Sequence, residues 1–233
     1  MPHYTAHRAT HWLATLALVL LTGCANIQNK GDTVAGNCNR TLNQTETVKL
    51  DLVSQLIDEA NYYSALAHLE NDSSGSPRAL WLRAEAQRKT GLLNEAYNNY
   101  RDLSLSCMTA AGHAGMAKIL ATRGDLAIAH QHMLKARQLA PTNADIRNDY
   151  GFILLAMGDF KAAQREFMTA MQLHQGHPVA LRNMVISLIL DGDSRTAMRL
   201  AKNNNIDDNQ FRELVNKASH FAKPAVAQRD ISQ

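Results

Sequence analysis

Apolar residues recur at helical spacing along most of the chain after residue 47. Leu52, Val53, Leu56 and Ile57 follow the three- and four-residue spacing of an amphipathic helix. A second run begins at Asn61-Tyr62-Tyr63-Ser64-Ala65-Leu66, and Asp72-Ser-Ser-Gly-Ser-Pro77 has the composition of a loop. The pattern predicts two helices within residues 48–76, with more helices following. Residues 25–47 are polar and lack this periodicity, which predicts a flexible segment.

Glycines punctuate the helical pattern at a nearly constant interval. They are Gly91, Gly124, Gly158 and Gly192. Each is followed five residues later by an alanine, namely Ala96, Ala129, Ala163 and Ala197. A period of about 34 residues with paired helices resembles the tetratricopeptide repeat (TPR), in which stacked helix pairs bury a continuous core.

The TPR resemblance divides the chain into segments. Four repeats are expected at 77–109, 110–143, 144–177 and 178–210, after a degenerate helical repeat at 48–76. In the third repeat, Gly151 and Ala163 occupy the small positions where two helices cross, and Gly158 makes the turn. The sequence also predicts a capping helix at 211–222 and a disordered tail at 223–233. The predicted fold is all-α, a right-handed superhelix of stacked TPR helix pairs.

The N-terminal segment has the features of a lipoprotein signal peptide. A mildly basic start precedes an apolar run, Trp12 to Leu21, that is too short for a membrane span. Leu21-Thr22-Gly23-Cys24 then resembles the bacterial lipobox. This resemblance implies cleavage after residue 23, lipidation of Cys24 and a lipid tether over 24–47. Ala25, rather than an aspartate, favours transport to the outer membrane, with the chain on its periplasmic face.

Two further cysteines, Cys38 and Cys107, remain after Cys24. In an oxidising periplasm an even pair is a candidate disulfide. The alternative is a buried Cys107 and a free Cys38.

Composition and motifs argue against several other functions. Removing Arg8 with the signal leaves a net charge of +2, from +3 for the full chain, which gives no case for nucleic-acid binding. No catalytic motif is present, so we expect neither enzyme activity nor a cofactor or metal. His130 and His132 are two apart on an expected helix and are interpreted as a solvated face, as are His174 and His177 beside a turn.

The TPR resemblance also implies a groove for a protein partner. In TPR proteins the first helix of each repeat lines the concave surface. The exposed positions expected there are Arg78, Trp81, Glu85, Arg88, Lys118, Asp145, Asn148, Asp149, Phe152, Arg182, Asn183 and Ile186. Asparagine and arginine are suited to a peptide backbone or carboxylate, and Trp81 and Phe152 to apolar side chains. The alternative is that these are ordinary solvated or packing residues.

A short lipoprotein made almost wholly of TPRs resembles the TadD family, the D component of tight-adherence (Tad/Flp) pilus assembly. The resemblance is carried by Ala136 to Pro141, Asp145 to Gly151, Leu154 to Asp159 and Val179 to Asn183. It implies pilotin-like help for an outer-membrane secretin, with secretin or pilus-assembly components as partners. The type IV pilus pilotin family, which has more regular repeats, and a periplasmic scaffold for peptidoglycan enzymes are the alternatives.

Overall fold

The computed structural model describes residues 38, 41–72 and 74–221, and these residues form eleven helices and no strand. None of the described helices is long and apolar enough to cross a membrane. The predicted lipobox with Cys24 lies outside the described residues. The helices are α1 (Gln44–Asp58), α2 (Tyr62–Glu70), α3 (Pro77–Lys89), α4 (Leu93–Leu103), α5 (Thr109–Thr122), α6 (Leu126–Leu139), α7 (Ala144–Ala156), α8 (Phe160–Leu173), α9 (Pro178–Leu190), α10 (Ser194–Asn203) and α11 (Asp208–Phe221).

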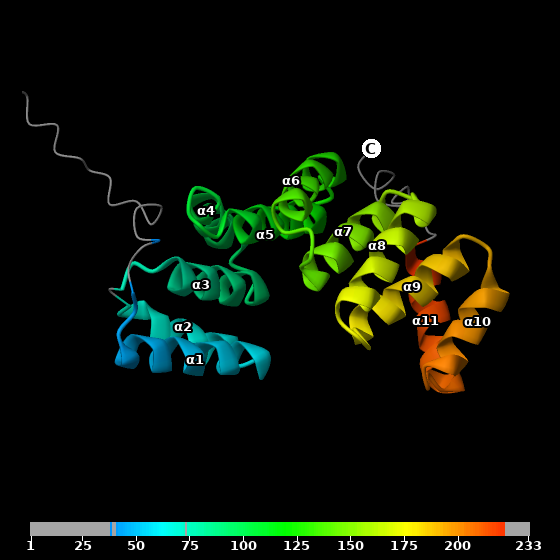
Figure 1. The fold of residues 1–233 in the computed structure, drawn as a ribbon, viewed down its shortest axis with the longest axis horizontal. Coiled ribbons are helices and arrows are strands. Elements are labelled where there is room, and N and C mark those ends of the chain that lie inside the picture. Colours follow the sequence, from blue (N-terminus) through cyan, green and yellow to red (C-terminus); the bar gives the residue numbers. More distant parts are fainter. Residues whose placement is uncertain (1–37, 39–40, 73, 222–233) are drawn as a thin grey trace, which may run out of the picture. The chain divides into compact units, whose positions relative to one another are not determined.

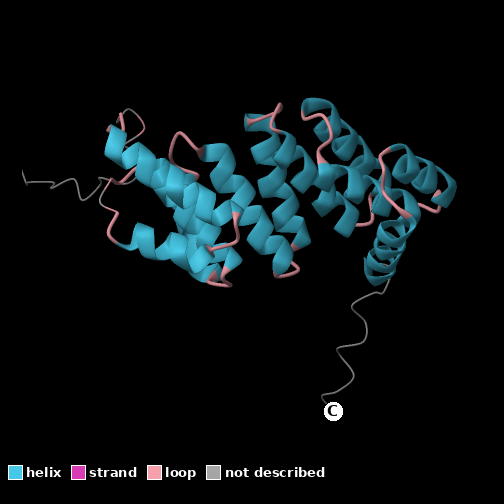
Figure 2. Ribbon diagram, turned by 90° about the horizontal axis from the view of Figure 1, so that it is seen from below, coloured by secondary structure: helices cyan, strands magenta, loops and turns pink. Residues whose placement is uncertain are grey.

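Consecutive helices form five antiparallel pairs that stack on one another (Figure 1). Each helix packs against the helices before and after it in sequence, up to α10. The first helices of neighbouring pairs are also in contact: α1 contacts α3, and α7 contacts α9. Loops occupy only short stretches between the helices (Figure 2). The predicted all-α class with stacked TPR-like helix pairs is confirmed.

The turn inside each pair has one recurring geometry. Gly91, Gly124, Gly158 and Gly192 have φ of +83°, +87°, +82° and +85°. At Gly158, the following Asp159 N–H donates to the Leu154 carbonyl across 3.0 Å, which is the Schellman bond that closes a helix end. A Cβ at this glycine would meet nothing within 4 Å, so the backbone angle rather than crowding requires glycine.

The first pair has the same turn without a glycine. Ala60 adopts φ +62° between α1 and α2, and the Asn61 N–H donates to the Leu56 carbonyl across 2.7 Å. The left-handed region costs an alanine about 1–2 kcal/mol. The turn of this divergent repeat is closed by the same local bond as the others, although the exposed Ala60 stands where the other pairs have glycine.

Helix crossings inside a pair depend on small residues. A Cβ on Gly151 of α7 would lie 2.6 Å from the ring of Phe167, which is fully buried on α8. The glycine lets the two helices approach until the phenylalanine fills the space between them. The role expected for Gly151 from the repeat pattern, a small residue where two helices cross, matches this geometry.

Capping residues set the helix boundaries, two of which differ from those expected. Asn43 and Glu46 form a reciprocal capping box, so α1 begins at Gln44 rather than near Val48. The α11 helix begins at Asp208, three residues before the expected start at Phe211. The second helix of the fourth repeat, α10, is short and ends at Asn203, beside the left-handed Asn205.

The last helix, α11, packs mainly against α9 rather than against its immediate predecessor, α10. Its fully buried residues are Leu214 and Ala218, which join the core formed by the later pairs. At its end, the Phe221 ring meets the Phe152 ring of α7 edge-on, with centroids 5.7 Å apart. Helix α11 thus covers part of the surface that the first helices of the last two pairs present.

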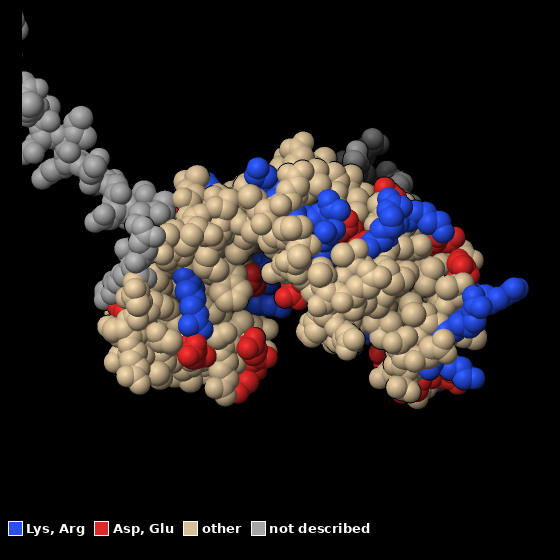
Figure 3. Space-filling view, viewed as in Figure 1, with Lys and Arg blue, Asp and Glu red and all other residues tan. Residues whose placement is uncertain are grey.

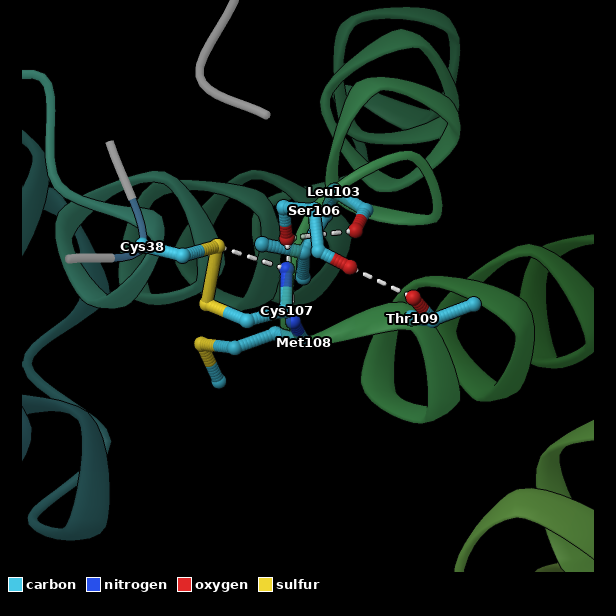
Figure 4. Close-up of a disulfide and its surroundings, with 6 residues drawn as sticks. All are labelled: Cys38, Leu103, Ser106, Cys107, Met108 and Thr109. Atoms are coloured by element: carbon cyan, nitrogen blue, oxygen red, sulfur yellow. Dashed lines mark hydrogen bonds between the residues drawn. A yellow bond between two sulfur atoms is a disulfide. The ribbon is translucent and has the colours of Figure 1, made fainter. Parts of the chain in front are cut away.

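A disulfide joins Cys38 to Cys107 in the loop between α4 and α5 (Figure 4). The two Cα atoms are 5.7 Å apart and the cysteines are 69 residues apart in sequence. The Cys107 N–H also donates to Cys38 Sγ across 2.8 Å. In the same loop, Ser106 Oγ donates to the Leu103 carbonyl and accepts from the Met108 N–H. The bridge therefore fixes a residue that precedes α1 to the loop between the second and third helix pairs.

Candidate partner-binding surface

One structural position recurs on the first helix of four successive pairs. Glu85 on α3, Lys118 on α5, Phe152 on α7 and Ile186 on α9 follow one another at the interval of the repeat, about 34 residues. We call these four residues the inner row. All four were expected in the groove, and their chemistry changes from an ion pair at the N-terminal end to apolar side chains at the C-terminal end.

The first half of the inner row is an ionic cluster. Glu85 accepts from Lys118 Nζ at 2.8 Å through Oε1 and from the Arg88 guanidinium at 2.6 Å through Oε2. Burial by itself would raise the pKa of Glu85, but the charges of Lys118 and Arg88 outweigh it and lower that pKa from 4.5 to about 2. Burial and the same carboxylate raise the pKa of the fully buried Tyr100 hydroxyl. One carboxylate here holds two cations.

Polar groups continue from the ionic cluster toward α9. Asn183 Nδ2 donates to Asn148 Oδ1 at 2.9 Å, and Asn148 Nδ2 donates to Asp149 Oδ1 at 3.3 Å. Burial raises the pKa of Asp149, and the nearby Lys118 charge opposes this increase. Asp149 has no ion-pair partner within 4 Å among the described residues.

Charged and apolar groups meet in one pocket of about 280 Å³ between α3, α5, α6 and α7. Its polar lining comes from Arg88, Lys118, Thr122 and Asp149. Its apolar lining comes from Ala121, Leu126, Met133, Phe152, Ile153 and Ala156. We call it the central pocket. Figure 3 shows side chains of both charges at the hollow beneath α5. A pocket with apolar walls and a few polar groups is suited to an anchoring side chain of a bound peptide.

The second half of the inner row differs in exposure as well as in chemistry. Phe152 is 41% exposed at the central pocket, whereas Ile186 is only 5% exposed. Ile186 belongs to the same core as Leu214 and Ala218 of α11. Because α11 packs on α9, it closes the part of the surface that Ile186 would otherwise present.

The prediction that all twelve groove residues are exposed is wrong for Glu85, Asn148 and Ile186, which are buried. Glu85 is enclosed by its two cations, Asn148 by its amide contacts, and Ile186 by α11. Trp81 is half-buried and packs against the core clusters on both sides of α3, which matches its alternative reading as a packing residue.

The remaining predicted residues lie away from the central pocket. Arg78 pairs with Asp51 of α1 at 2.6 Å, and the exposed Asp145 contacts His177 at 3.2 Å. Arg182 lines a separate cleft of about 620 Å³ between α9 and α11, with Glu213 and Lys217 on the α11 side. Of the twelve predicted residues, Arg88, Lys118, Asp149 and Phe152 line the central pocket.

The interpretation of His177 as a solvent residue is wrong. It is 5% exposed and caps α9, because its Nδ1 accepts from the Ala180 N–H at 3.1 Å. The sequence signal was Pro178, since proline favours the first position of a helix and places the cap at the residue before it. His130 and His132 are also not simply solvated: His130 contacts Tyr150, and His132 contacts His113.

A curated relative places this repeat architecture in a family. The chain is 32% identical over 203 residues to the TPR repeat-containing protein PA4299 of Pseudomonas aeruginosa, covering 87% of this chain and 82% of the relative. This chain belongs to the TPR repeat-containing proteins. No profile of a known protein family matches it.

Solved structures agree with the TPR fold. The Thermus thermophilus TPR protein TTC0263 matches with a TM-score of 0.63 and 19% identity, over 76% of this chain and 98% of that one. YrrB, described as a TPR protein with an unusual peptide-binding site, matches with a TM-score of 0.51 and 14% identity, over 72% of this chain and 90% of that one. These likenesses support the fold, and a TPR protein of this fold is suited to protein–protein interaction.

Proposed function

We propose that this TPR protein is a periplasmic scaffold, anchored to the outer membrane through Cys24, that binds protein partners during Tad/Flp pilus assembly. Its role is pilotin-like help in localising or assembling an outer-membrane secretin. The observation that carries the binding function is the central pocket, where Arg88, Lys118, Asp149 and Phe152 converge from three first helices. The lipobox resemblance supports the anchor, and the TadD resemblance supports the pilus system.

The pocket favours binding over catalysis. Its two cations are held by Glu85, so neither is a free nucleophile or base. No group of three His, Cys, Asp or Glu residues that could hold a metal ion occurs within the described part of the chain. What the pocket offers instead is an exposed aromatic face beside a carboxylate and two paired cations, a combination suited to an extended peptide with one apolar side chain.

Affinity capture from detergent-solubilised outer membranes tests the proposal, with lipidated full-length protein as bait and mass spectrometry as readout. We expect a secretin with pilus-assembly proteins, and we expect Phe152→Ala to reduce the recovery at least tenfold. Met168→Ala is the matched control, because Met168 is 43% exposed on α8, the second helix of the same pair. It should retain wild-type recovery. Recovery of cell-wall enzymes without any secretin contradicts the pilus role and leaves the peptidoglycan scaffold.

The anchor is tested separately with Cys24→Ser. The unmodified thiol is required for diacylation, so this variant should leave the outer-membrane fraction and lose the mass of its acyl chains. Several acyl chains hold a protein firmly, since each buried methylene contributes about 0.8 kcal/mol. A Cys24→Ser protein that still fractionates with the outer membrane and has an unchanged mature mass contradicts lipidation at this residue.

A further inference from the structure

Two histidines from the two helices of one pair face each other. His113 on α5 and His132 on α6 place their Nδ1 atoms 3.0 Å apart. Their ring centroids are 5.2 Å apart and the ring planes are inclined by 36°. Both side chains are half-buried, and α5 and α6 pack more extensively than any other two helices among the described residues. The helix pair therefore holds both rings in place before any ligand arrives.

Both Nδ1 atoms of this pair can become available to a metal without loss of a proton. Metals bind the neutral imidazole. When both rings are neutral, one Nδ1 carries the proton of the hydrogen bond and the other accepts it. Moving that proton to Nε2 of its own ring frees both Nδ1 lone pairs without releasing a proton to solvent.

The separation of the two nitrogens fits two ligands of one ion. Metal–imidazole bonds are about 2.0 Å long, so the observed 3.0 Å separation corresponds to an angle at the metal of about 97°. Two adjacent ligand nitrogens of a tetragonal ion are about 2.8 Å apart, and those of a tetrahedral ion are about 3.3 Å apart. Both separations are estimated from the same metal–nitrogen bond length. The observed separation of the two Nδ1 atoms lies between these values.

We infer that His113 and His132 form a binding site for a divalent transition metal of the copper and zinc class, with Cu²⁺ bound most tightly. Imidazole is a preferred ligand of these ions, and divalent affinity peaks at copper in the first-row series. The described residues supply no third ligand, so water fills the remaining positions. The ion connects α5 to α6. The site is independent of the partner-binding function.

Calorimetric titration with Cu²⁺, delivered as its glycine complex, tests the site. The protein is the full chain without an affinity tag, because other histidines would add sites. His113→Gln and His132→Gln should each bind one Cu²⁺ fewer than wild type, or bind it at least tenfold more weakly. The matched control is His130→Gln, on the same helix as His132, where the ring contacts the Tyr150 hydroxyl at 3.0 Å instead. It should bind as wild type does. Equal numbers of sites and equal affinities in wild type and His113→Gln overturn the inference.

Two further measurements distinguish loss of metal binding from an effect of the substitutions on folding. Cu²⁺ should raise the melting temperature of wild type and His130→Gln but not of His113→Gln. In the unaltered protein, pulsed electron paramagnetic resonance should show Cu²⁺ coupled to two imidazole nitrogens at one site. A spectrum with coupling to at most one imidazole per copper overturns the inference without reference to any variant.

Discussion

The two ends of the inner row use the same backbone position for different purposes. At the N-terminal end, Glu85 and Lys118 form an ion pair that joins two neighbouring repeats. At the C-terminal end, Ile186 is buried with residues of α11, and Phe152 remains exposed beside the central pocket. A repeat therefore fixes where a side chain lies, while the residue at that position decides whether it stabilises the stack or meets a partner.

The two ends also differ in the interactions that stabilise them. The N-terminal pairs carry a covalent bridge, Cys38–Cys107, in addition to their ionic cluster. The later pairs have an ionic cluster of their own, in which the buried Glu166 of α8 pairs with Arg137 of α6 at 3.0 Å and with Arg147 of α7 at 2.9 Å. Among the described residues they carry no covalent bridge, and α11 adds the buried Leu214 and Ala218. We therefore expect the largest losses of stability on perturbing the first end and smaller ones at the second.

The largest effect is expected from the disulfide. A bridge that closes a loop of 69 residues stabilises the folded state by about 4 kcal/mol in the chain-entropy account. Cys38→Ser with Cys107→Ser should lose this amount in urea unfolding. Wild type in reducing buffer should lose a similar amount, whereas the double variant should not respond to the reductant. A decrease in the free energy of unfolding of less than about 1 kcal/mol would contradict the claim that the bridge is the main stabilising feature of the N-terminal pairs.

Glu85→Gln should cost about 3 kcal/mol at pH 7, because it leaves Arg88 and Lys118 without their shared carboxylate. The folded pKa of Glu85 is depressed from 4.5 to about 2, so its contribution is fully present above pH 4.5 and is lost as the pH falls toward 2. Urea unfolding at a series of pH values measures the difference from wild type. Glu95→Gln, at an exposed acid on α4, is the control and should cost little at any pH.

Ile186→Ala should lower the free energy of unfolding by about 2 kcal/mol. The substitution leaves a cavity under α11, which the terminal helix can partly close. The equivalent change in the next repeat toward the N-terminus, Phe152→Ala, should cost less than about 1 kcal/mol, since that ring is 41% exposed, yet it should reduce partner recovery. Paired unfolding and capture experiments separate the two roles. The comparison fails if Ile186→Ala weakens capture without affecting stability.

The smallest effect is expected at the turn of the first pair. Ala60→Gly should gain about 0.5 kcal/mol, because relief of the left-handed strain at φ +62° exceeds the extra backbone entropy of glycine. Gly158→Ala, the reverse change at φ +82°, should cost about 1 kcal/mol although there is open space around its Cβ. The melting temperatures of the two variants should therefore shift in opposite directions from that of wild type.

The periodic glycines predicted the fold well, because each turn is local. A helix end that needs a left-handed residue selects glycine whatever surrounds it, so the repeat interval could be read directly from the chain. The first pair was recognised as a divergent repeat, but the strained Ala60 was not foreseen. An alanine in the sequence does not mark a left-handed residue in the way that a glycine does.

The candidate site was predicted less completely. Repeat position correctly brought Arg88, Lys118, Asp149 and Phe152 to neighbouring first helices. It could not show that α11 covers Ile186, because that depends on the direction in which the final helix packs. Nor could it bring His113 to His132, since the sequence places them 19 residues apart on different helices.

The sequence by itself determined the helices, their turns and their pairing, because capping, left-handed glycines and small crossing residues act over a few residues. The tertiary structure decided which inner-row residues are exposed, which carboxylates hold two cations, and which histidines meet. Burial and charge pairing depend on side chains from helices far apart in the chain. Only the packed stack brings those side chains within a few ångströms of one another.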